Sequence, residues 1–169
     1  MADKPIFTGI LQIGFIVKNL DASVRRWVEE CGIGPWKIYE FTPENVDQMI
    51  IRGKRQEYAM RLATTYVGSV QLELIEPKDD KSTHAEFLRE HGEGLHHVAF
   101  EVDDYGKAVG WYEKRGEPIL HGGRRSGKAF TYFDLRKDLG LIAEIYDVAP
   151  GSPPPEPDAV YPEKTFNGS

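Results

Sequence analysis

The chain has 169 residues, of which 40% are hydrophobic and 28% charged, so it suits one globular domain and is not disordered throughout. Its formal net charge of −6, from 27 acidic and 21 basic residues, disfavours a nucleic-acid partner, because phosphate groups are bound by basic faces. A single cysteine, Cys31, cannot form an internal disulfide, which excludes a secreted disulfide scaffold.

The first apolar stretch, from Phe7 to Val17, is interrupted by Gln12. It is far shorter than the ~20 residues that cross a bilayer, and it lacks the basic lead and small-residue exit of a secretory signal. We therefore expect a soluble, cytoplasmic protein without a membrane partner.

The first half of the chain predicts a strand, a helix and three more strands. Apolar residues alternate from Leu11 to Val17, as in a strand with one buried face. Asn19 and Asp21 offer helix-cap chemistry, and Gly32 is typical of a helix end. The later elements are strands near Trp36 to Phe41, Glu57 to Thr65 and Val70 to Glu76, followed by a linking helix over Ser82 to His91.

The second half repeats this order, which is the main signal for the fold. A strand over His96 to Val102 matches Leu11 to Val17, and a helix between Asp103 and Gly116 follows it. Further strands are expected over Glu117 to His121, Ala129 to Leu135 and Leu141 to Asp147.

The repeat predicts an α+β fold of two βαβββ modules whose curved, barrel-like sheet encloses a cavity. We expect one domain over residues 8–148, with module one at 8–77, the linking helix at 82–91 and module two at 95–148. Residues 149–169 hold six of the eleven prolines and predict an extended tail, which Tyr161 and Phe166 could anchor.

Strand alternation predicts which polar side chains share the cavity. Successive side chains of a strand point to opposite faces, so packing of Ile13, Phe15 and Val17 on a helix turns Gln12 inward. The same count in the other strands turns Glu73, His97 and Glu144 inward. Two buried carboxylates repel each other unless one holds a proton or a cation lies between them. This set therefore suggests a divalent metal ion.

The repeat and these four positions resemble the vicinal oxygen chelate superfamily over nearly all of residues 8–148. The stretches Leu74-Ile75-Glu76-Pro77 and Gly92 to Val102 resemble its methylmalonyl-CoA epimerase branch in particular. The resemblance implies a glyoxalase-like fold, a metal held by Gln12, Glu73, His97 and Glu144, a small α-carbonyl substrate that could be an acyl-CoA, and a homodimer.

Two positions depart from the epimerase pattern. Epimerases of this kind usually present histidine where Gln12 stands, whereas the combination of Gln, Glu, His and Glu resembles the human-type glyoxalase I ligand set. Alignment also sets Arg61 at or near the position of the epimerase proton-transfer glutamate, and Glu57 reaches that position only with a shift.

The donor types indicate the chemistry. One imidazole and three oxygen donors suit Co, Mn, Ni, Zn or Mg, with positions left open for substrate. A metal that polarises a carbonyl makes the neighbouring C–H acidic and stabilises an enolate. We expect an epimerase or racemase acting at a carbon α to a thioester or ketone, in which the ligands Glu73 and Glu144 could also act as catalytic bases.

Other functions remain open. A glyoxalase I-type lyase would share the four ligands, a racemase of an aromatic ketone such as an isoflavanone would share the reaction, and a small-molecule binding protein would share the fold without the metal. An extradiol-type dioxygenase is disfavoured, because it needs two histidines and one carboxylate around Fe(II), and Gln12 stands in place of the first histidine.

The remaining histidines have simpler interpretations. The alternation of the strand points His96 away from the cavity, which predicts a structural role. His84 and His91 fall in the linker and predict ordinary polar residues, as does His121, although His121 could border a substrate mouth. Arg124 and Arg125 predict a flexible basic loop, which could bind a phosphate or carboxylate or could simply be solvated.

Overall fold

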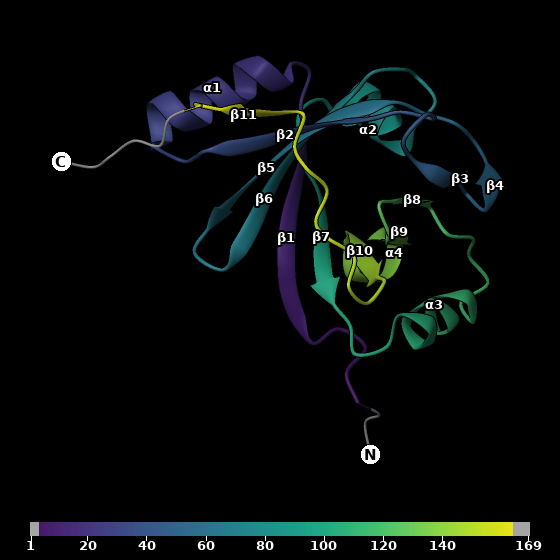
Figure 1. Cartoon of the computed structure of the whole chain (residues 1–169). Helices are drawn as coiled ribbons and strands as arrows, with labels where there is room; N and C mark the ends of the chain where they lie inside the picture. The colour runs from purple at the N-terminus through teal and green to yellow at the C-terminus, as the bar shows by residue number, and fades with distance from the viewer. Residues whose placement is uncertain (1–3, 164–169) are drawn as a thin grey trace.

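One curved sheet dominates the fold. The computed structural model describes residues 4–163, and eleven strands of this part of the chain form the sheet. The strands are β1 Gly9–Ile16, β2 Trp36–Phe41, β3 Asp47–Ile51, β4 Lys54–Arg55, β5 Met60–Val67, β6 Val70–Pro77, β7 Gly94–Glu101, β8 His121–Arg125, β9 Lys128–Leu135, β10 Leu141–Val148 and β11 Ala159–Tyr161. Their order across the sheet is β11-β2-β5-β6-β1-β7-β10-β9-β8-β3-β4, and Figure 1 shows how strongly the sheet bends along it.

The two halves of the chain meet where β1 pairs with β7. In each half the long last strand runs parallel to the first, so β6 lies beside β1 and β10 lies beside β7. The two first strands are antiparallel to each other, with Gly14 opposite His97. The predicted α+β fold, with two βαβββ modules in one curved sheet, is confirmed.

Helices α1 and α3 cover the outside of the sheet, one on each half (Figure 1). The helix bounds are α1 Leu20–Cys31, α2 Thr83–His91, α3 Tyr105–Glu113 and the short α4 Arg136–Leu139. Helix α1 begins after Asn19, whose Oδ1 accepts a hydrogen bond of 2.9 Å from the amide of Ala22. It ends at Gly32, which has a left-handed φ of 65° that favours glycine.

The core has three parts, one outside each half of the sheet and one inside the bend. Val24 and Val28 of α1 pack against Trp36 and Leu74 on the outer face of the first half. Helix α3 packs in the same way on the second half. We call the opposite face the inner face; it carries a buried apolar cluster from both halves, which includes Ile16, Leu62, Ile75, Phe130, Tyr132 and Ile142.

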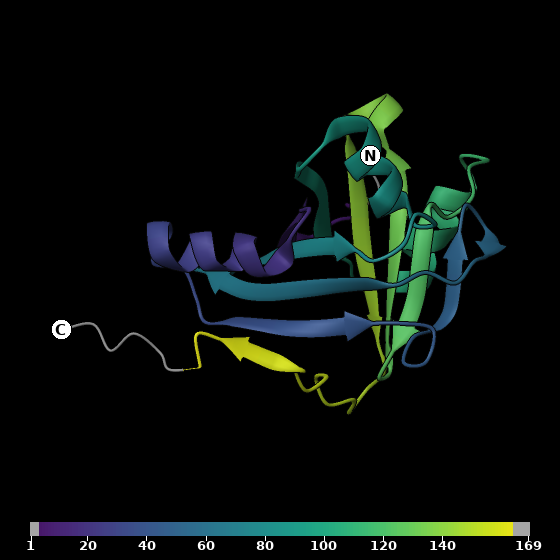
Figure 2. The same ribbon diagram turned by 90° about the horizontal axis from the view of Figure 1, so that it is seen from above.

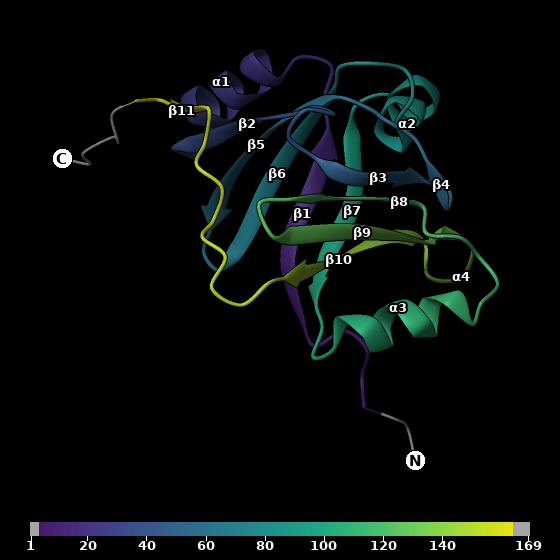
Figure 3. The same ribbon diagram turned by 45° about the vertical axis from the view of Figure 1, so that its right-hand side comes forward.

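A hairpin that the sequence did not predict, β3–β4, belongs to the first half but extends the sheet of the second. Strand β3 pairs with β8, with Ile51 opposite His121 (Figure 3). The prediction of a strand ending at residue 121 and a loop after it was wrong, because β8 begins at His121 and uses two glycines for close packing. A Cβ on Gly123 would lie 2.7 Å from Phe130 Cζ and 2.9 Å from Val46 Cγ1.

The C-terminal segment returns from the second half to the edge of the first. Strand β11 pairs antiparallel with β2, as Figure 2 shows, and Asp158 Oδ2 accepts a hydrogen bond of 2.8 Å from the amide of Glu40. Tyr161 packs against the cluster that contains Trp36, whereas Phe166 lies outside the described residues. No helix within residues 4–163 is long and apolar enough to cross a membrane.

Candidate functional site

The four polar side chains expected in one cavity lie together on the inner face. Gln12, Glu73, His97 and Glu144 come from the four central strands, β1, β6, β7 and β10, and each is at most 6% exposed. His97 Nε2 lies 3.1 Å from Glu144 Oε2, 3.4 Å from Glu73 Oε2 and 3.3 Å from Gln12 Oε1. One ligand atom each from Glu73, His97 and Glu144 lie within 4.8 Å of one another, so this triad could hold a metal ion.

Gly14 makes room for the imidazole of His97. The two residues face each other across the β1–β7 pair, and a Cβ on Gly14 would lie 1.9 Å from His97 Cε1 and 2.3 Å from Nε2. No other residue type leaves this space on β1. The ring therefore sits directly over the backbone of the neighbouring strand, where its Nε2 faces the two carboxylates.

The charges in this cluster fit a cation. Among the residues that the structure describes, Glu73 Oε2 is buried without a hydrogen-bond partner, and burial raises the pKa of this carboxyl group. Burial alone would lower the pKa of His97, but Glu144 and Glu73 outweigh it and raise the pKa to about 9. Without a metal, the cluster therefore retains a proton on His97 between the carboxylates. A divalent ion would replace that proton and give Glu73 Oε2 a partner.

Tyr146 and Gln71 orient the amide of Gln12. The Tyr146 hydroxyl lies 2.7 Å from Gln12 Oε1 and 2.8 Å from Glu144 Oε2, and its single proton can be donated to either oxygen. On the other side, Gln12 Nε2 donates a hydrogen bond of 2.7 Å to Gln71 Oε1. The amide oxygen of Gln12 is thereby turned toward His97, which is the orientation that a metal ligand needs.

Lys128 adds a cationic group beside the cluster. Its Nζ lies 3.4 Å from the centre of the Tyr146 ring. Burial lowers the pKa of Lys128, while Glu144 and Glu73 act in the opposite direction. The sequence interpretation missed both Lys128 and Tyr146, although the alternation that turns Glu144 inward also turns Tyr146 inward two residues later.

Arg61 does not reach this site. It lies on the outer face of β5, where its guanidinium contacts Asp21 of α1 at 3.0 Å and Glu40 of β2 at 2.7 Å. The neighbouring inner-face positions of β5, Met60 and Leu62, are buried in the apolar cluster. The side chain of Arg61 therefore points away from the site, and neither Arg61, Met60 nor Leu62 supplies a carboxylate there.

Three histidines expected to be structural or polar surface residues are buried near the site. His96 was expected to point away from the cavity, but its Nδ1 lies 3.1 Å from Nδ1 of His97. His84 and His121 are 0% exposed, and His121 Nδ1 lies 2.7 Å from Thr83 Oγ1. His84 does lie in the predicted linking helix, but the expectation of an ordinary polar role was wrong for His84 and His121, because α2 and β8 pack both rings against Tyr132 of the apolar cluster. His91, by contrast, is exposed.

Arg124 and Arg125 belong to β8 and not to a flexible loop. Arg124 pairs with Asp147 at 2.9 Å. Arg125 donates to the carbonyl of Glu40 at 2.9 Å and lies over the ring of Phe41. Both guanidinium groups therefore have partners within the fold, which removes the basis for the expected basic loop.

Comparisons with known proteins give one family match. The model of the Glyoxalase/Bleomycin resistance protein/Dioxygenase superfamily matches residues 11–133. A 4-hydroxyphenylpyruvate dioxygenase of Legionella pneumophila (strain Corby) is 38% identical over 71 residues, which are 41% of this chain. That match spans only 20% of the dioxygenase.

Solved structures match over more of the chain. The methylmalonyl-CoA epimerase of Mycobacterium tuberculosis is 21% identical, with a TM-score of 0.64 over 89% of this chain and 94% of the epimerase. A variant of the Streptomyces coelicolor methylmalonyl-CoA epimerase in complex with 2-nitronate-propionyl-CoA is 24% identical, with a TM-score of 0.60 over 85% of this chain and 99% of the epimerase. At these identities the likeness shows the fold.

Proposed function

Because the chain belongs to the Glyoxalase/Bleomycin resistance protein/Dioxygenase superfamily, we propose that it is a divalent-metal isomerase, an epimerase or racemase acting at a carbon α to a thioester or ketone. The observation that carries the proposal is the buried convergence of Gln12, Glu73, His97 and Glu144 in the bend of the sheet. The fold shared with two methylmalonyl-CoA epimerases supports the reaction class. An acyl-CoA is one candidate substrate.

The four side chains would hold the metal through one imidazole nitrogen and three oxygens. This mixed set suits Co, Mn, Ni, Zn or Mg. When bound, the metal would polarise the substrate carbonyl and stabilise the negative charge that develops on its oxygen. The inner-face apolar cluster, with Tyr132 and Phe130 next to the site, would limit access of water to the reacting carbon.

The two carboxylates would carry the proton. Inversion requires that the α-proton leave one face of the carbon and that a proton return to the other. As the C–H bond breaks, its electron pair forms the C=C bond of the enolate, the carbonyl π pair moves onto the oxygen, and the proton moves to a carboxylate oxygen. Glu73 comes from the first half of the sheet and Glu144 from the second, and one of them would take the proton while the other returns one. The tyrosine hydroxyl of Tyr146 would hold Glu144 in place.

Gln12 favours a second candidate function, a glyoxalase I-type lyase or isomerase. Its amide oxygen points toward His97, so the site offers a combination of Gln, Glu, His and Glu. This combination resembles the human-type glyoxalase I ligand set. Racemisation of an aromatic ketone, such as an isoflavanone, would be the same inversion of an α-carbon on another substrate. Assembly as a homodimer and a cytoplasmic location stay predictions.

The test combines metal analysis with exchange of the substrate α-proton. Purified protein is analysed for its metal content and then incubated in deuterium oxide with methylmalonyl-CoA, with an isoflavanone and with the hemithioacetal of glutathione and methylglyoxal. Deuterium incorporation with inversion of methylmalonyl-CoA or the isoflavanone supports the isomerase. Conversion of the hemithioacetal alone supports the lyase, and a protein that holds no metal supports a binding function.

The variant Glu144→Gln is expected to lose both tight metal binding and α-proton exchange, because it removes one carboxylate from the cluster. Glu113→Gln is the matched control, since Glu113 is exposed on α3, away from the inner face. Exchange at the wild-type rate in Glu144→Gln contradicts the assignment.

A further inference from the structure

We infer that His96 is a positioning residue for the proposed metal ligand His97, whose Nδ1–H it accepts. This role rests on the proposed metal centre. It adds His96 to that centre, although strand alternation alone would point His96 away from the cavity. Three features carry it: an irregularity in β7, the direction of the two rings and the packing around His96.

The irregularity is a β-bulge. Along the β1–β7 pair, Gly14 is opposite His97 but the next residue, Phe15, is opposite Leu95. His96 therefore has no partner across the pair, as expected for the extra residue of a bulge. Bulges re-aim side chains next to functional sites. Here the bulge brings two consecutive histidines, 6% and 1% exposed, into the same buried region.

The direction of the His97 ring fixes which hydrogen it carries. Its Nε2 faces Glu144 at 3.1 Å and Glu73 at 3.4 Å, so a metal ion held there would use the Nε2 lone pair. The hydrogen of the neutral ring must then be on Nδ1, which lies 3.1 Å from Nδ1 of His96. His96 must accept this hydrogen bond and carry its own hydrogen on Nε2. Histidine ligands commonly donate their second N–H to a fixed acceptor in this way.

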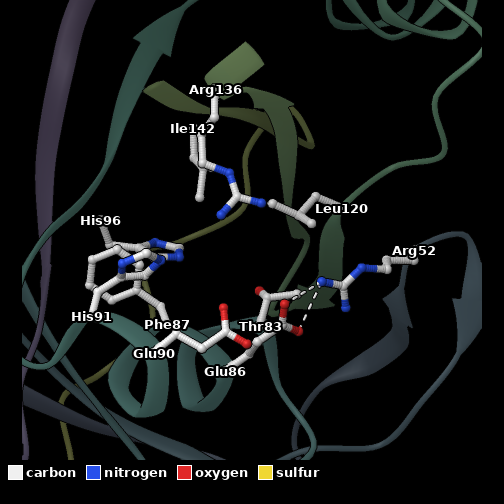
Figure 4. Close-up of a pocket in the computed structure, with 10 residues that line it drawn as sticks. All are labelled: Arg52, Thr83, Glu86, Phe87, Glu90, His91, His96, Leu120, Arg136 and Ile142. Atoms are coloured by element: carbon white, nitrogen blue, oxygen red, sulfur yellow. Dashed lines mark hydrogen bonds and ion pairs between the residues drawn. The ribbon is translucent and has the colours of Figure 1, made fainter. Parts of the chain in front are cut away.

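Packing holds the acceptor in place. The ring of His96 is perpendicular to that of Phe87, with centroids 5.0 Å apart, and makes an edge contact with His84 at 4.9 Å. Its Nε2 is buried without a partner in the described chain. His96 also lines a narrow pocket of about 10 Å³, which includes Arg136 and the Arg52–Glu86 ion pair (Figure 4). A space of this size holds about one water molecule, which could accept the hydrogen of Nε2.

The experiment measures metal binding with and without the acceptor. Full-length apoprotein is titrated with Co²⁺, followed by calorimetry and by the visible absorption of the bound ion. His96→Phe keeps a flat ring but has no acceptor, whereas His96→Asn keeps an acceptor near the position of Nδ1. His84→Phe is the matched control, because it alters a buried ring that touches His96 and leaves the His96–His97 hydrogen bond intact.

We expect His96→Phe to weaken Co²⁺ binding by about 10- to 100-fold and to change the visible spectrum. A loss of this size is usual when the acceptor of a histidine ligand's second N–H is removed. His96→Asn should restore most of the affinity, and His84→Phe should bind as the wild type does. Wild-type affinity in His96→Phe, or an equal loss in His96→Asn and His96→Phe, overturns the inference.

A second measurement needs no variant. The ¹⁵N shifts of the imidazoles in the wild-type protein report which ring nitrogen carries the hydrogen, and we expect Nδ1–H on His97 and Nε2–H on His96. A hydrogen on Nδ1 of His96 overturns the inference even if His96→Phe fails to fold. Absence of Co²⁺ binding by the wild-type protein overturns the proposed metal centre itself, a result distinct from intact binding in His96→Phe.

Discussion

The substitution Gly14→Ala tests the geometry of the site with a single methyl group. The new Cβ would lie 1.9 Å from His97 Cε1, and ordinary van der Waals contact begins at 3.4 Å, so the ring would have to withdraw by about 1.5 Å. Metal–nitrogen distances tolerate a deviation of only about 0.2 Å. A methyl group on β1 therefore removes His97 from the cluster without changing any of the four polar residues.

Gly14→Ala should change two quantities, the stability of the apoprotein and its affinity for metal. Overpacking at a buried position costs typically about 1–3 kcal/mol, so the free energy of unfolding of the apoprotein should fall by that amount. Removing the hydrogen-bond partner of a metal ligand weakens metal binding by about 10- to 100-fold. Displacement of the ligand His97 itself should therefore weaken binding by at least about 100-fold.

The assay compares Co²⁺ titrations and urea unfolding of Gly14→Ala with those of Gly110→Ala. Gly110 lies within α3, where an added Cβ meets nothing within 4 Å in residues 4–163, so this control should bind metal normally and gain about 0.5–1 kcal/mol of stability. Metal binding by Gly14→Ala at the wild-type affinity would mean that the metal does not need His97 at the position that it has in the structure.

Three further predictions concern Tyr146, Arg61 and His121. Tyr146→Phe removes the hydroxyl between Gln12 and Glu144 and should weaken Co²⁺ binding by about 10- to 100-fold; an unchanged affinity would contradict the orienting role. Arg61→Met should cost about 1 kcal/mol in urea unfolding through its partly exposed ion pairs but leave the Co²⁺ affinity unchanged, and a loss of affinity would mean that Arg61 does reach the site. Burial lowers the pKa of His121 from 6.5 to about 3, so between these values the unfolded chain binds more protons. Stability of the apoprotein should therefore fall as the pH falls below 6.5, and this ring should contribute up to about 1.4 kcal/mol per pH unit to the fall. The free energy of unfolding of His121→Asn, measured in urea, should depend less steeply on pH, and a slope equal to that of the wild type would contradict the prediction.

Alternation along single strands was enough to find the four central side chains. Gln12, Glu73, His97 and Glu144 lie on strands whose outer faces pack on helices, so the apolar residues of each strand identify the inner face. Tyr146 follows from the same rule. It was missed because tyrosine beside a carboxylate is not a metal ligand pattern, although its hydroxyl lies within hydrogen-bond distance of Gln12 and Glu144.

Alternation failed at His96 because a bulge is a property of two strands. The extra residue is defined by the offset between Gly14–Phe15 on β1 and Leu95–His97 on β7, and the sequence of β7 alone does not contain this offset. The sequence therefore predicts which polar side chains meet on the inner face better than it predicts the residues that surround them.

The β8 segment was misread for a related reason. Gly122 and Gly123 beside two arginines are typical of a flexible loop. In the fold the same glycines let β3, β8 and β9 pack closely, since side chains at these positions would collide with Phe130 and Val46. Strand β3 comes from the other half of the chain, and no local pattern near β8 indicates a partner so far away in sequence.

The site and the junction of the two halves are one feature. Each half supplies one carboxylate from its last long strand, Glu73 or Glu144, and one further donor from its first strand, Gln12 or His97. Pairing of β1 with β7 buries all four, so the electrostatic cost of burying two carboxylates is incurred when the halves join. A proton on His97 offsets part of this cost, and a divalent cation would offset more. Metal affinity and the stability of the junction are then linked, because an ion that binds only the joined halves also favours their joining.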